Sequence, residues 1–177
     1  MSVFEIILLV LTIFVGSTIV WSTLIVGISP MPSTKNARKA MIELSEKTGP
    51  GTIYELGSGW GNILIPLAKQ YPERQIIGYE LSILPWLTTR LLIKVMGLNN
   101  VHVYRKNFLN ENLTAASVIM CYLVPEVMSK VEKKLNVEGG KIQYLISNNF
   151  ALPSYDPIAT IELNDLYRSP IYLYKIK

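Results

Sequence analysis

Residues 54–62 read Tyr-Glu-Leu-Gly-Ser-Gly-Trp-Gly-Asn, and this stretch decides the fold that we expect. It leaves an apolar run, turns on Gly57, Gly59 and Gly61, and enters a second run with helical spacing. Glycines let a ligand approach the backbone closely, and the N-terminus of the following helix offers unpaired N–H groups. A tight turn that needs glycine only for its backbone angles is the structural alternative. We interpret the stretch as a ligand-binding turn between a strand and a helix.

The spacing of these glycines and two nearby carboxylates indicate the kind of ligand. The pattern is G-x-G-x-G, whereas dinucleotide sites use G-x-G-x-x-G, which weighs against a nicotinamide cofactor. Glu55, two residues before Gly57, would face an anionic pyrophosphate poorly but a zwitterionic amino acid well. Glu80 ends the next expected strand, where a carboxylate can accept hydrogen bonds from both hydroxyls of a ribose. The site therefore favours a ligand with a methionine-like group and a ribose.

The rest of the chain alternates expected strands and helices. We expect strands at 52–56, 75–80, 101–104, 117–122, 141–147, 159–166 and 171–176, and helices at 35–48, 61–70, 82–96 and 125–135. Repeated βα units imply a parallel sheet with helices on both faces. The connection 167–170 is short enough for a hairpin, so the last strand should run antiparallel. Residues 148–157 have no helical pattern, and we expect a loop there at the carboxyl edge of an α/β, Rossmann-like, seven-stranded and mostly parallel sheet.

The N-terminus has a different composition from the rest of the chain. The first 34 residues contain one charged side chain, Glu5, and residues 6–28 form a run of 23 uncharged residues. At about 1.5 Å per residue this run reaches about 34 Å, enough for a hydrocarbon core of about 30 Å. Two prolines at 30 and 32 end the helix. The pattern predicts one transmembrane helix, with a buried core helix as the alternative.

Basic residues follow this segment at once, at Lys35, Arg38 and Lys39. The positive-inside bias then places the remaining domain on the cytoplasmic side. We therefore predict a transmembrane anchor over 1–31, a catalytic domain over 32–177, and a single-pass membrane protein whose catalytic domain is cytoplasmic.

Charge and cysteine content exclude several other classes. The net charge of +4 is modest and no run of five like charges occurs, so no nucleic-acid partner is expected. Cys121 is the sole cysteine, which excludes an internal disulfide and a cysteine-based structural zinc site. We expect no metal site.

Several motifs outside the glycine turn narrow the assignment. They are Pro32-Ser33-Thr34-Lys35, Gly78-Tyr79-Glu80-Leu81, Pro85-Trp86, Tyr122-Leu123-Val124-Pro125 and Val131-Glu132-Lys133-Lys134-Leu135. Together with the turn at 55–59, they make residues 33–177 resemble the class I S-adenosylmethionine-dependent methyltransferases. Within that class, the chain resembles the small membrane-anchored protein-lysine methyltransferases of the ATP synthase c-subunit and the adenine nucleotide translocase, with their prokaryotic relatives.

The resemblance implies a cofactor, S-adenosylmethionine, and a set of residues around it. Ser33 and Thr34 should lie over its methionine end, Glu55 and Gly57 beneath it, and Glu80 on its ribose. Asn107 stands where an aspartate often meets the adenine amino group, and Trp60 replaces an acidic residue that is common in the family. The expected cofactor-binding residues are Ser33, Thr34, Glu55, Gly57, Ser58, Gly59, Gly61, Glu80 and Asn107.

The acceptor side is predicted from aromatic residues near the strand ends. Methyl transfer from a sulfonium is an in-line displacement, so the enzyme must hold a neutral nucleophile on the methyl axis and exclude water. Tyr122, Phe150 and Tyr155 can supply aromatic walls around an entering lysine, and core packing or a solvent-facing loop is the alternative.

We therefore expect methyl transfer to a lysine of a membrane or membrane-proximal protein, with the membrane itself contacted through the N-terminal helix. Three alternatives stay open. These are a methyltransferase for a lipid or small molecule near the membrane, a non-catalytic module that binds S-adenosylmethionine, and a nicotinamide-dependent oxidoreductase, which the glycine spacing disfavours.

Overall fold

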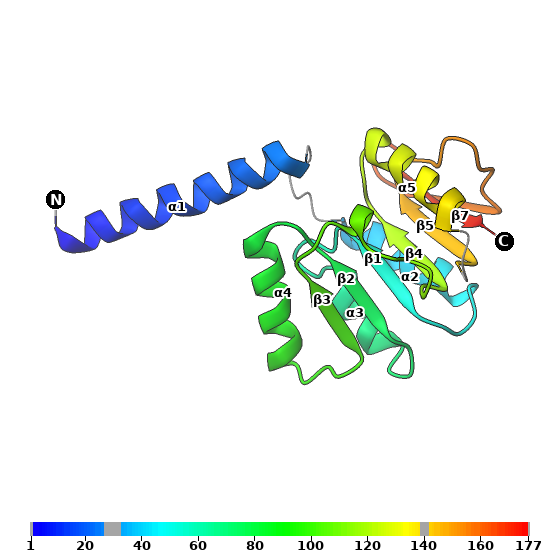
Figure 1. Cartoon of the computed structure of the whole chain (residues 1–177), viewed down its shortest axis with the longest axis horizontal. Coiled ribbons are helices and arrows are strands. Elements are labelled where there is room, and N and C mark those ends of the chain that lie inside the picture. Colours follow the sequence, from blue (N-terminus) through cyan, green and yellow to red (C-terminus); the bar gives the residue numbers. More distant parts are fainter. Residues whose placement is uncertain (1, 27–32, 139–141, 177) are drawn as a thin grey trace.

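The computed structural model describes residues 2–26, 33–138 and 142–176. Within these residues, seven strands form one sheet in the order β3-β2-β1-β4-β5-β7-β6 (Figure 1). The strands are β1 Ile53–Leu56, β2 Ile76–Tyr79, β3 Val101–Tyr104, β4 Val118–Cys121, β5 Tyr144–Asn148, β6 Ala159–Glu162 and β7 Pro170–Lys175. The helices are α1 Val3–Val26, α2 Lys35–Glu46, α3 Leu64–Gln70, α4 Ile83–Val95 and α5 Pro125–Glu138, with a short 3-10 helix η1 at Phe108–Asn110.

Strand direction in the sheet agrees with the expected fold. Strands β1 to β5 pair in parallel, whereas β7 runs antiparallel to both β5 and β6. The chain crosses to β2 on one side of β1 and to β4 on the other, so the strand order reverses between β1 and β4. Ligands of open α/β sheets bind beyond the carboxyl ends of the strands at such a reversal. The glycine turn leaves β1 at this point.

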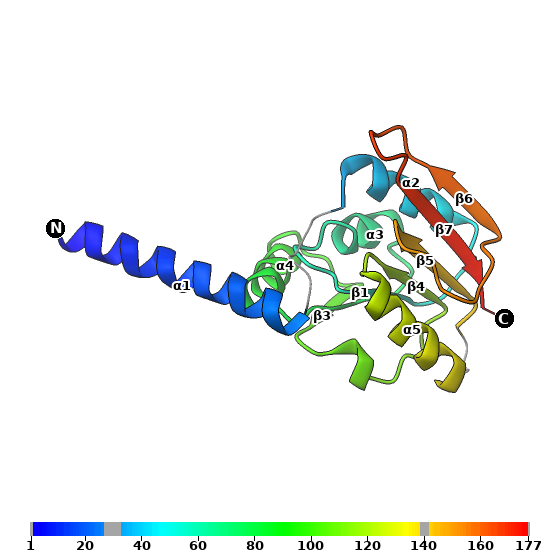
Figure 2. The same cartoon turned by 90° about the horizontal axis from the view of Figure 1, so that it is seen from above.

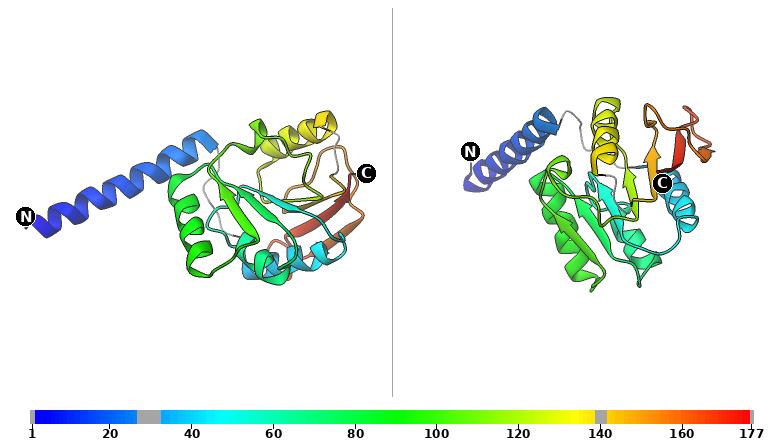
Figure 3. Two further views of the ribbon diagram at one scale, coloured as in Figure 1. Left: turned by 60° about the horizontal axis from the view of Figure 1, so that its bottom comes forward. Right: turned by 45° about the vertical axis from the view of Figure 1, so that its right-hand side comes forward.

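Helices cover both faces of the sheet (Figure 2). Helices α2 and α3 lie on one face, and α5 lies on the opposite face. Each face has its own buried cluster: Met41, Leu44 and Leu64 belong to the first, whereas Met128 and Val131 of α5 belong to the second. Helix α4 lies beside β3 at one edge of the sheet, as both views of Figure 3 show. The carboxyl ends of β1, β2, β4 and β5 are therefore held between packed layers.

Some element boundaries differ from the predicted ones, for local reasons. Helix α3 begins at Leu64 and not at residue 61, because Gly57, Gly59 and Gly61 all have positive φ angles of 77°, 52° and 75° and extend the turn. Strand β6 ends at Glu162, four residues early, because the carboxylate of Asp165 accepts hydrogen bonds from two backbone N–H groups of the following turn.

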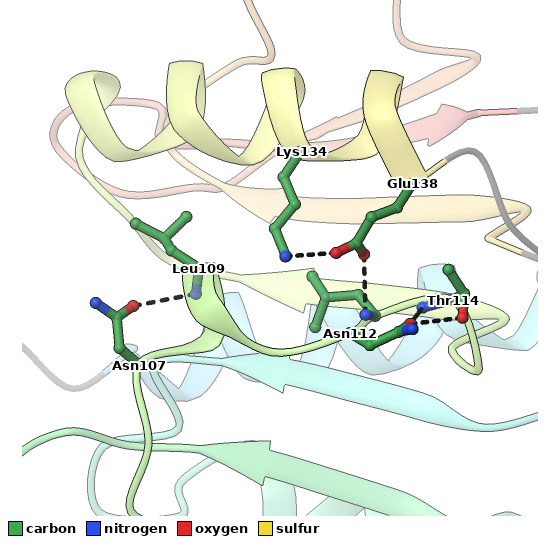
Figure 4. Close-up of polar contacts among 7 residues, drawn as sticks. Asn107, Leu109, Asn112, Thr114, Lys134 and Glu138 are labelled. Atoms are coloured by element: carbon green, nitrogen blue, oxygen red, sulfur yellow. Dashed lines mark hydrogen bonds and ion pairs between the residues drawn. The ribbon is translucent and has the colours of Figure 1, made fainter.

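Helix α5 is longer than expected, since it continues to Glu138 and not to residue 135. Figure 4 shows the contacts that hold this end. Glu138 pairs with Lys134 one turn earlier, and its other carboxylate oxygen accepts a hydrogen bond from the Leu113 N–H at 2.9 Å. The helix end is thereby tied to the loop before β4.

The N-terminal prediction requires a correction. The uncharged run forms helix α1, which Figure 1 shows outside the layered domain and which ends at Val26; residues 27–32, with the two prolines, lie outside the described residues. In the described part of the chain, no helix has both the length and the apolar character that a membrane crossing requires. The prediction rested on an uncharged run dominated by Ile, Leu, Val and Phe, and α1 also includes five serines and threonines. The predicted location, a single-pass membrane protein with a cytoplasmic catalytic domain, is therefore contradicted.

Candidate cofactor and acceptor site

The glycine turn is held against the end of β2 by its own backbone. The N–H groups of Gly57 and Ser58 both donate to the carbonyl oxygen of Tyr79, at 2.9 Å each. A Cβ added at Gly59 would have no described heavy atom within 4 Å, whereas one added at Gly61 would meet Thr89 Cγ2 of α4 at 2.8 Å. Gly59 thus borders open space that a ligand could fill, and Gly61 serves the packing of the turn on α4.

Glu80 is buried at the end of β2, with 8% of its surface exposed. Its Oε2 accepts a hydrogen bond from the Gly59 N–H at 2.8 Å, and its Oε1 accepts one from the Ser82 N–H at 2.7 Å. Each carboxylate oxygen can accept more than one hydrogen bond, so acceptor capacity remains for a ribose. The carboxylate therefore joins three segments: the end of β2, the glycine turn and the start of α4.

Glu55 is more deeply buried, with 4% exposed, and its Oε2 has no hydrogen-bond partner among the described residues. Burial and the nearby charge of Glu80 raise the pKa of Glu55 well above its usual value, while a hydrogen bond from the Leu64 N–H acts in the opposite direction. An unpaired carboxylate oxygen in the interior is costly. An ammonium group would supply the missing partner.

Ser33 and Thr34 precede α2 and have different contacts. The Thr34 Oγ1 accepts a hydrogen bond from the Ala37 N–H at 3.2 Å and caps the helix. The Ser33 Oγ accepts one from Asn148 Nδ2 at 3.4 Å, which places Ser33 at the carboxyl end of β5. Sequence reasoning missed Asn148, which is buried. A polar residue at the end of an otherwise apolar parallel strand was the signal that could have found it.

Two of the three predicted acceptor residues come together. The rings of Tyr122 and Phe150 are stacked, with centroids 6.3 Å apart and planes inclined by 19°. A tight turn places Phe150 there: its N–H donates to the Asn148 carbonyl oxygen at 2.8 Å, across Asn149, whose φ angle is +67°. Tyr155 points elsewhere, because its hydroxyl donates to Asn136 Oδ1 of α5 at 2.9 Å.

The last two predicted cofactor residues lie on either side of β2. Ser58 is buried, its Oγ has no partner in the described part of the chain, and a Cβ at Gly78 would come within 3.0 Å of it. Asn107 is exposed, and its Oδ1 accepts a hydrogen bond from the Leu109 N–H at 3.0 Å at the start of η1 (Figure 4). Its oxygen keeps one further acceptor position.

The strand order, the glycine turn and the carboxylates at β1 and β2 together define the class I methyltransferase fold. A family model, the ANTKMT methyltransferase domain, matches residues 55–159, and the chain belongs to this family. The protein is therefore an S-adenosylmethionine-dependent methyltransferase, as its sequence predicted.

Two relatives agree with this assignment, and one solved structure shares the fold. A protein-lysine N-methyltransferase of Saccharolobus islandicus (strain REY15A) is 23% identical over 148 residues, covering 82% of this chain and 92% of the relative. The adenine nucleotide translocase lysine N-methyltransferase of Mus musculus is 33% identical over 115 residues, covering 63% of this chain and 49% of the relative. The chain thus spans about half the length of the mouse protein. An RNA methyltransferase from Salinibacter ruber in complex with S-adenosyl-L-homocysteine shares the fold, with 24% identity, a TM-score of 0.71, and coverage of 82% of this chain and 94% of that one.

The residues present fit S-adenosylmethionine. The unpaired Oε2 of Glu55 suits the methionyl ammonium, the remaining acceptor capacity of Glu80 suits ribose hydroxyls, and the open space at Gly59 allows close approach to the backbone. The cofactor supplies a methyl group activated by its bond to a sulfonium. What remains for the chain is to orient the cofactor and an acceptor and to exclude water.

Proposed function

We propose that this protein transfers the methyl group to the side-chain nitrogen of a lysine in another protein. The observation that carries the proposal is the stacked pair of Tyr122 and Phe150. In the register of β1 and β4, Leu56 pairs with Cys121. Tyr122 follows β4 and Gly57 follows β1, so the tyrosine and the glycine turn begin at the same edge of the sheet. Two relatives named as lysine methyltransferases support the same acceptor class.

The aromatic pair suits the chemistry of a lysine. A cationic ammonium approaches aromatic rings favourably, and partial desolvation then lowers its pKa, so that the amine can lose its proton to water. The neutral nitrogen needs its lone pair on the axis of the bond between methyl carbon and sulfur, which breaks as the new carbon–nitrogen bond forms. We therefore expect activity to rise with pH through roughly 7–9.

We further propose how the cofactor lies in the site. Glu55 binds the methionyl ammonium, Glu80 accepts hydrogen bonds from the ribose, and the glycine turn at 57–61 lies beneath the methionyl group. Ser58 packs under the turn, Ser33 and Thr34 lie above the methionyl group, and Asn107 is at the adenine. Phe150 and Tyr122 line the place where the acceptor lysine enters. Tyr155 helps to shape the loop beside this place, while its hydroxyl is bonded to Asn136. What supports this arrangement is the burial of both carboxylates and the unpaired oxygen of Glu55.

The finer proposals concern the acceptor and the domain. The acceptor lysine belongs to a membrane or membrane-proximal protein, a proposal supported by the relative that is named for the adenine nucleotide translocase. The methyltransferase domain extends over 32–177, and its proposed first residue lies outside the described residues.

A labelling experiment tests the acceptor class. The purified full chain is incubated with methyl-labelled S-adenosylmethionine and a membrane and protein extract from cells that lack the gene. We expect label in protein that yields methyllysine on hydrolysis, and much slower labelling when the Tyr122→Ala variant replaces the enzyme. Label confined to the organic extract or to small molecules would contradict the proposal and favour the lipid or small-molecule alternative. Absence of any transfer, with intact cofactor binding, would favour a non-catalytic module.

A further inference from the structure

Arg38 reaches from α2 to the segment where the glycine turn ends and α3 begins. Its Nη1 donates to the carbonyl oxygen of Asn62 at 3.5 Å, while its Nε is buried and has no hydrogen-bond partner in the described part of the chain. Neither of the ion pairs found among the described residues includes Arg38. A buried guanidinium nitrogen without an acceptor is costly, so its presence points to a missing anionic partner.

Glu55 reaches the same segment from β1. The backbone of Leu64, two residues after Asn62, lies near enough to Glu55 to lower the pKa of its carboxyl group, and the Oε2 of Glu55 is buried without a partner among the described residues. A cationic and an anionic side chain, each with one buried polar atom that lacks a partner, therefore both lie beside residues 62–64. A zwitterionic amino acid has two charges of opposite sign on one carbon atom. It could satisfy both side chains together.

We infer that Arg38 binds the carboxylate of the methionyl group, while Glu55 binds its ammonium. Arginine suits this role because its planar guanidinium can form two parallel hydrogen bonds to one carboxylate. The neighbouring cations of α2, Lys35 and Lys39, are exposed. Arg38 is half-buried, and its side chain contacts Asn62, the residue that follows the glycine turn. The inference rests on the cofactor position proposed above, and it does not depend on the identity of the acceptor.

Three ligands that differ in their amino-acid part test the contacts of Arg38 and Glu55 one at a time. S-adenosylhomocysteine has both charges, its decarboxylated analogue keeps only the ammonium, and methylthioadenosine has neither. Isothermal titration of the full chain should show that Arg38→Gln weakens S-adenosylhomocysteine binding by about ten- to a hundredfold. The same substitution should leave the affinity for the other two ligands unchanged. Glu55→Gln should weaken both ligands that have an ammonium and leave methylthioadenosine unaffected.

Matched variants distinguish a carboxylate contact from a structural one. Lys39→Gln removes the adjacent, exposed cation of α2 and should change no affinity. Arg38→Lys keeps the positive charge but lacks the planar guanidinium with its two parallel donors. This variant should bind S-adenosylhomocysteine with intermediate affinity and unfold at the wild-type temperature. If Arg38→Gln or Arg38→Lys weakened all three ligands equally, Arg38 would only brace the turn at Asn62 and the inference would be wrong. An unchanged affinity for S-adenosylhomocysteine in both variants would overturn it as well. Because no acceptor takes part, neither result bears on lysine methylation.

Discussion

The Oε2 of Glu80 accepts a hydrogen bond from the Gly59 N–H at 2.8 Å, so the acidic end of β2 holds the centre of the glycine turn. The second oxygen accepts from the Ser82 N–H at 2.7 Å and fixes the residue before α4. Both donors are backbone N–H groups, so the Glu80 carboxylate holds the main chain itself at the glycine turn and before α4. Glu80 therefore shapes the site in addition to its proposed contact with the ribose.

Replacement of Glu80 should weaken the cofactor strongly. Glu80→Ala removes a charged acceptor for ribose and two backbone contacts, and we expect S-adenosylhomocysteine to bind roughly ten- to a hundredfold more weakly, as measured by titration calorimetry. Glu73→Ala is the matched control, because Glu73 is an exposed carboxylate in the connection between α3 and β2. An unchanged affinity in a folded Glu80→Ala protein would remove Glu80 from the site.

Valine at Gly59 should block the ligand as well as strain the backbone. Gly59 and Gly49 have positive φ angles of 52° and 67°, and a Cβ at either would have no described heavy atom within 4 Å. Gly59→Val and Gly49→Val should each lower the free energy of unfolding by at least about 1 kcal/mol, because side chains disfavour this backbone conformation. Urea unfolding measures this common effect. Only Gly59→Val should weaken S-adenosylhomocysteine, and equal affinities for the two variants would contradict the placement of the cofactor.

Glu55 should make stability depend on pH. Its pKa in the folded protein is raised well above the usual value of 4.5, first by burial and then by the charge of Glu80. The folded state therefore binds this proton more tightly than the unfolded state, and the free energy of unfolding should fall as pH rises from 4.5 through the raised pKa.

Glu55→Gln removes this titration. Without cofactor, the variant should be more stable than the wild type above the raised pKa, and its stability should change less with pH, as urea unfolding from about pH 4 to about pH 8 would show. It should nevertheless bind S-adenosylhomocysteine more weakly, since the ammonium loses its charged partner. A variant with the wild-type pH dependence would show that Glu55 is not the titrating group.

Tyr122 should affect turnover more than cofactor binding. Tyr122→Ala removes the ring that stacks on Phe150, and we expect kcat to fall roughly ten- to a hundredfold because the acceptor is less well positioned. Tyr122→Phe keeps the ring and should retain most activity. Tyr167→Ala serves as control, because Tyr167 is 83% exposed in the hairpin connection. Equal losses in kcat and in affinity for S-adenosylhomocysteine would assign Tyr122 to the cofactor instead.

Much of the fold could be predicted because local patterns and tertiary packing agree. The glycine turn, the βα alternation and the antiparallel last strand all follow from the sequence and are confirmed. Boundaries were less accurate where side chains bond to the backbone, as Asp165 does after β6. Periodicity contains no information about such contacts. The predicted membrane location rested on the uncharged, largely aliphatic run at 6–28 and on the basic residues after it, and it is contradicted because no described helix has the length and apolar character of a membrane span.

The candidate site was predictable at residues that belong to motifs, and less so elsewhere. Glu55 and Glu80 follow from their positions beside the glycine turn, although nothing in the sequence showed that Glu80 would bond to two backbone amides. Thr34 was expected above the cofactor, and its hydroxyl caps α2. Arg38 and Asn148 were missed as site residues because their contacts join segments far apart in the sequence. Such contacts depend on how α2 packs against the sheet.

The most direct test of lysine methylation compares the proteins of cells with and without the gene by mass spectrometry. We expect at least one lysine that is methylated in cells with the gene and unmethylated in cells without it. Methylation should return with the wild-type gene, and a gene encoding Tyr122→Ala should restore it more slowly. Identical lysine methylation in both cell types, under conditions in which the protein is present, would contradict the account.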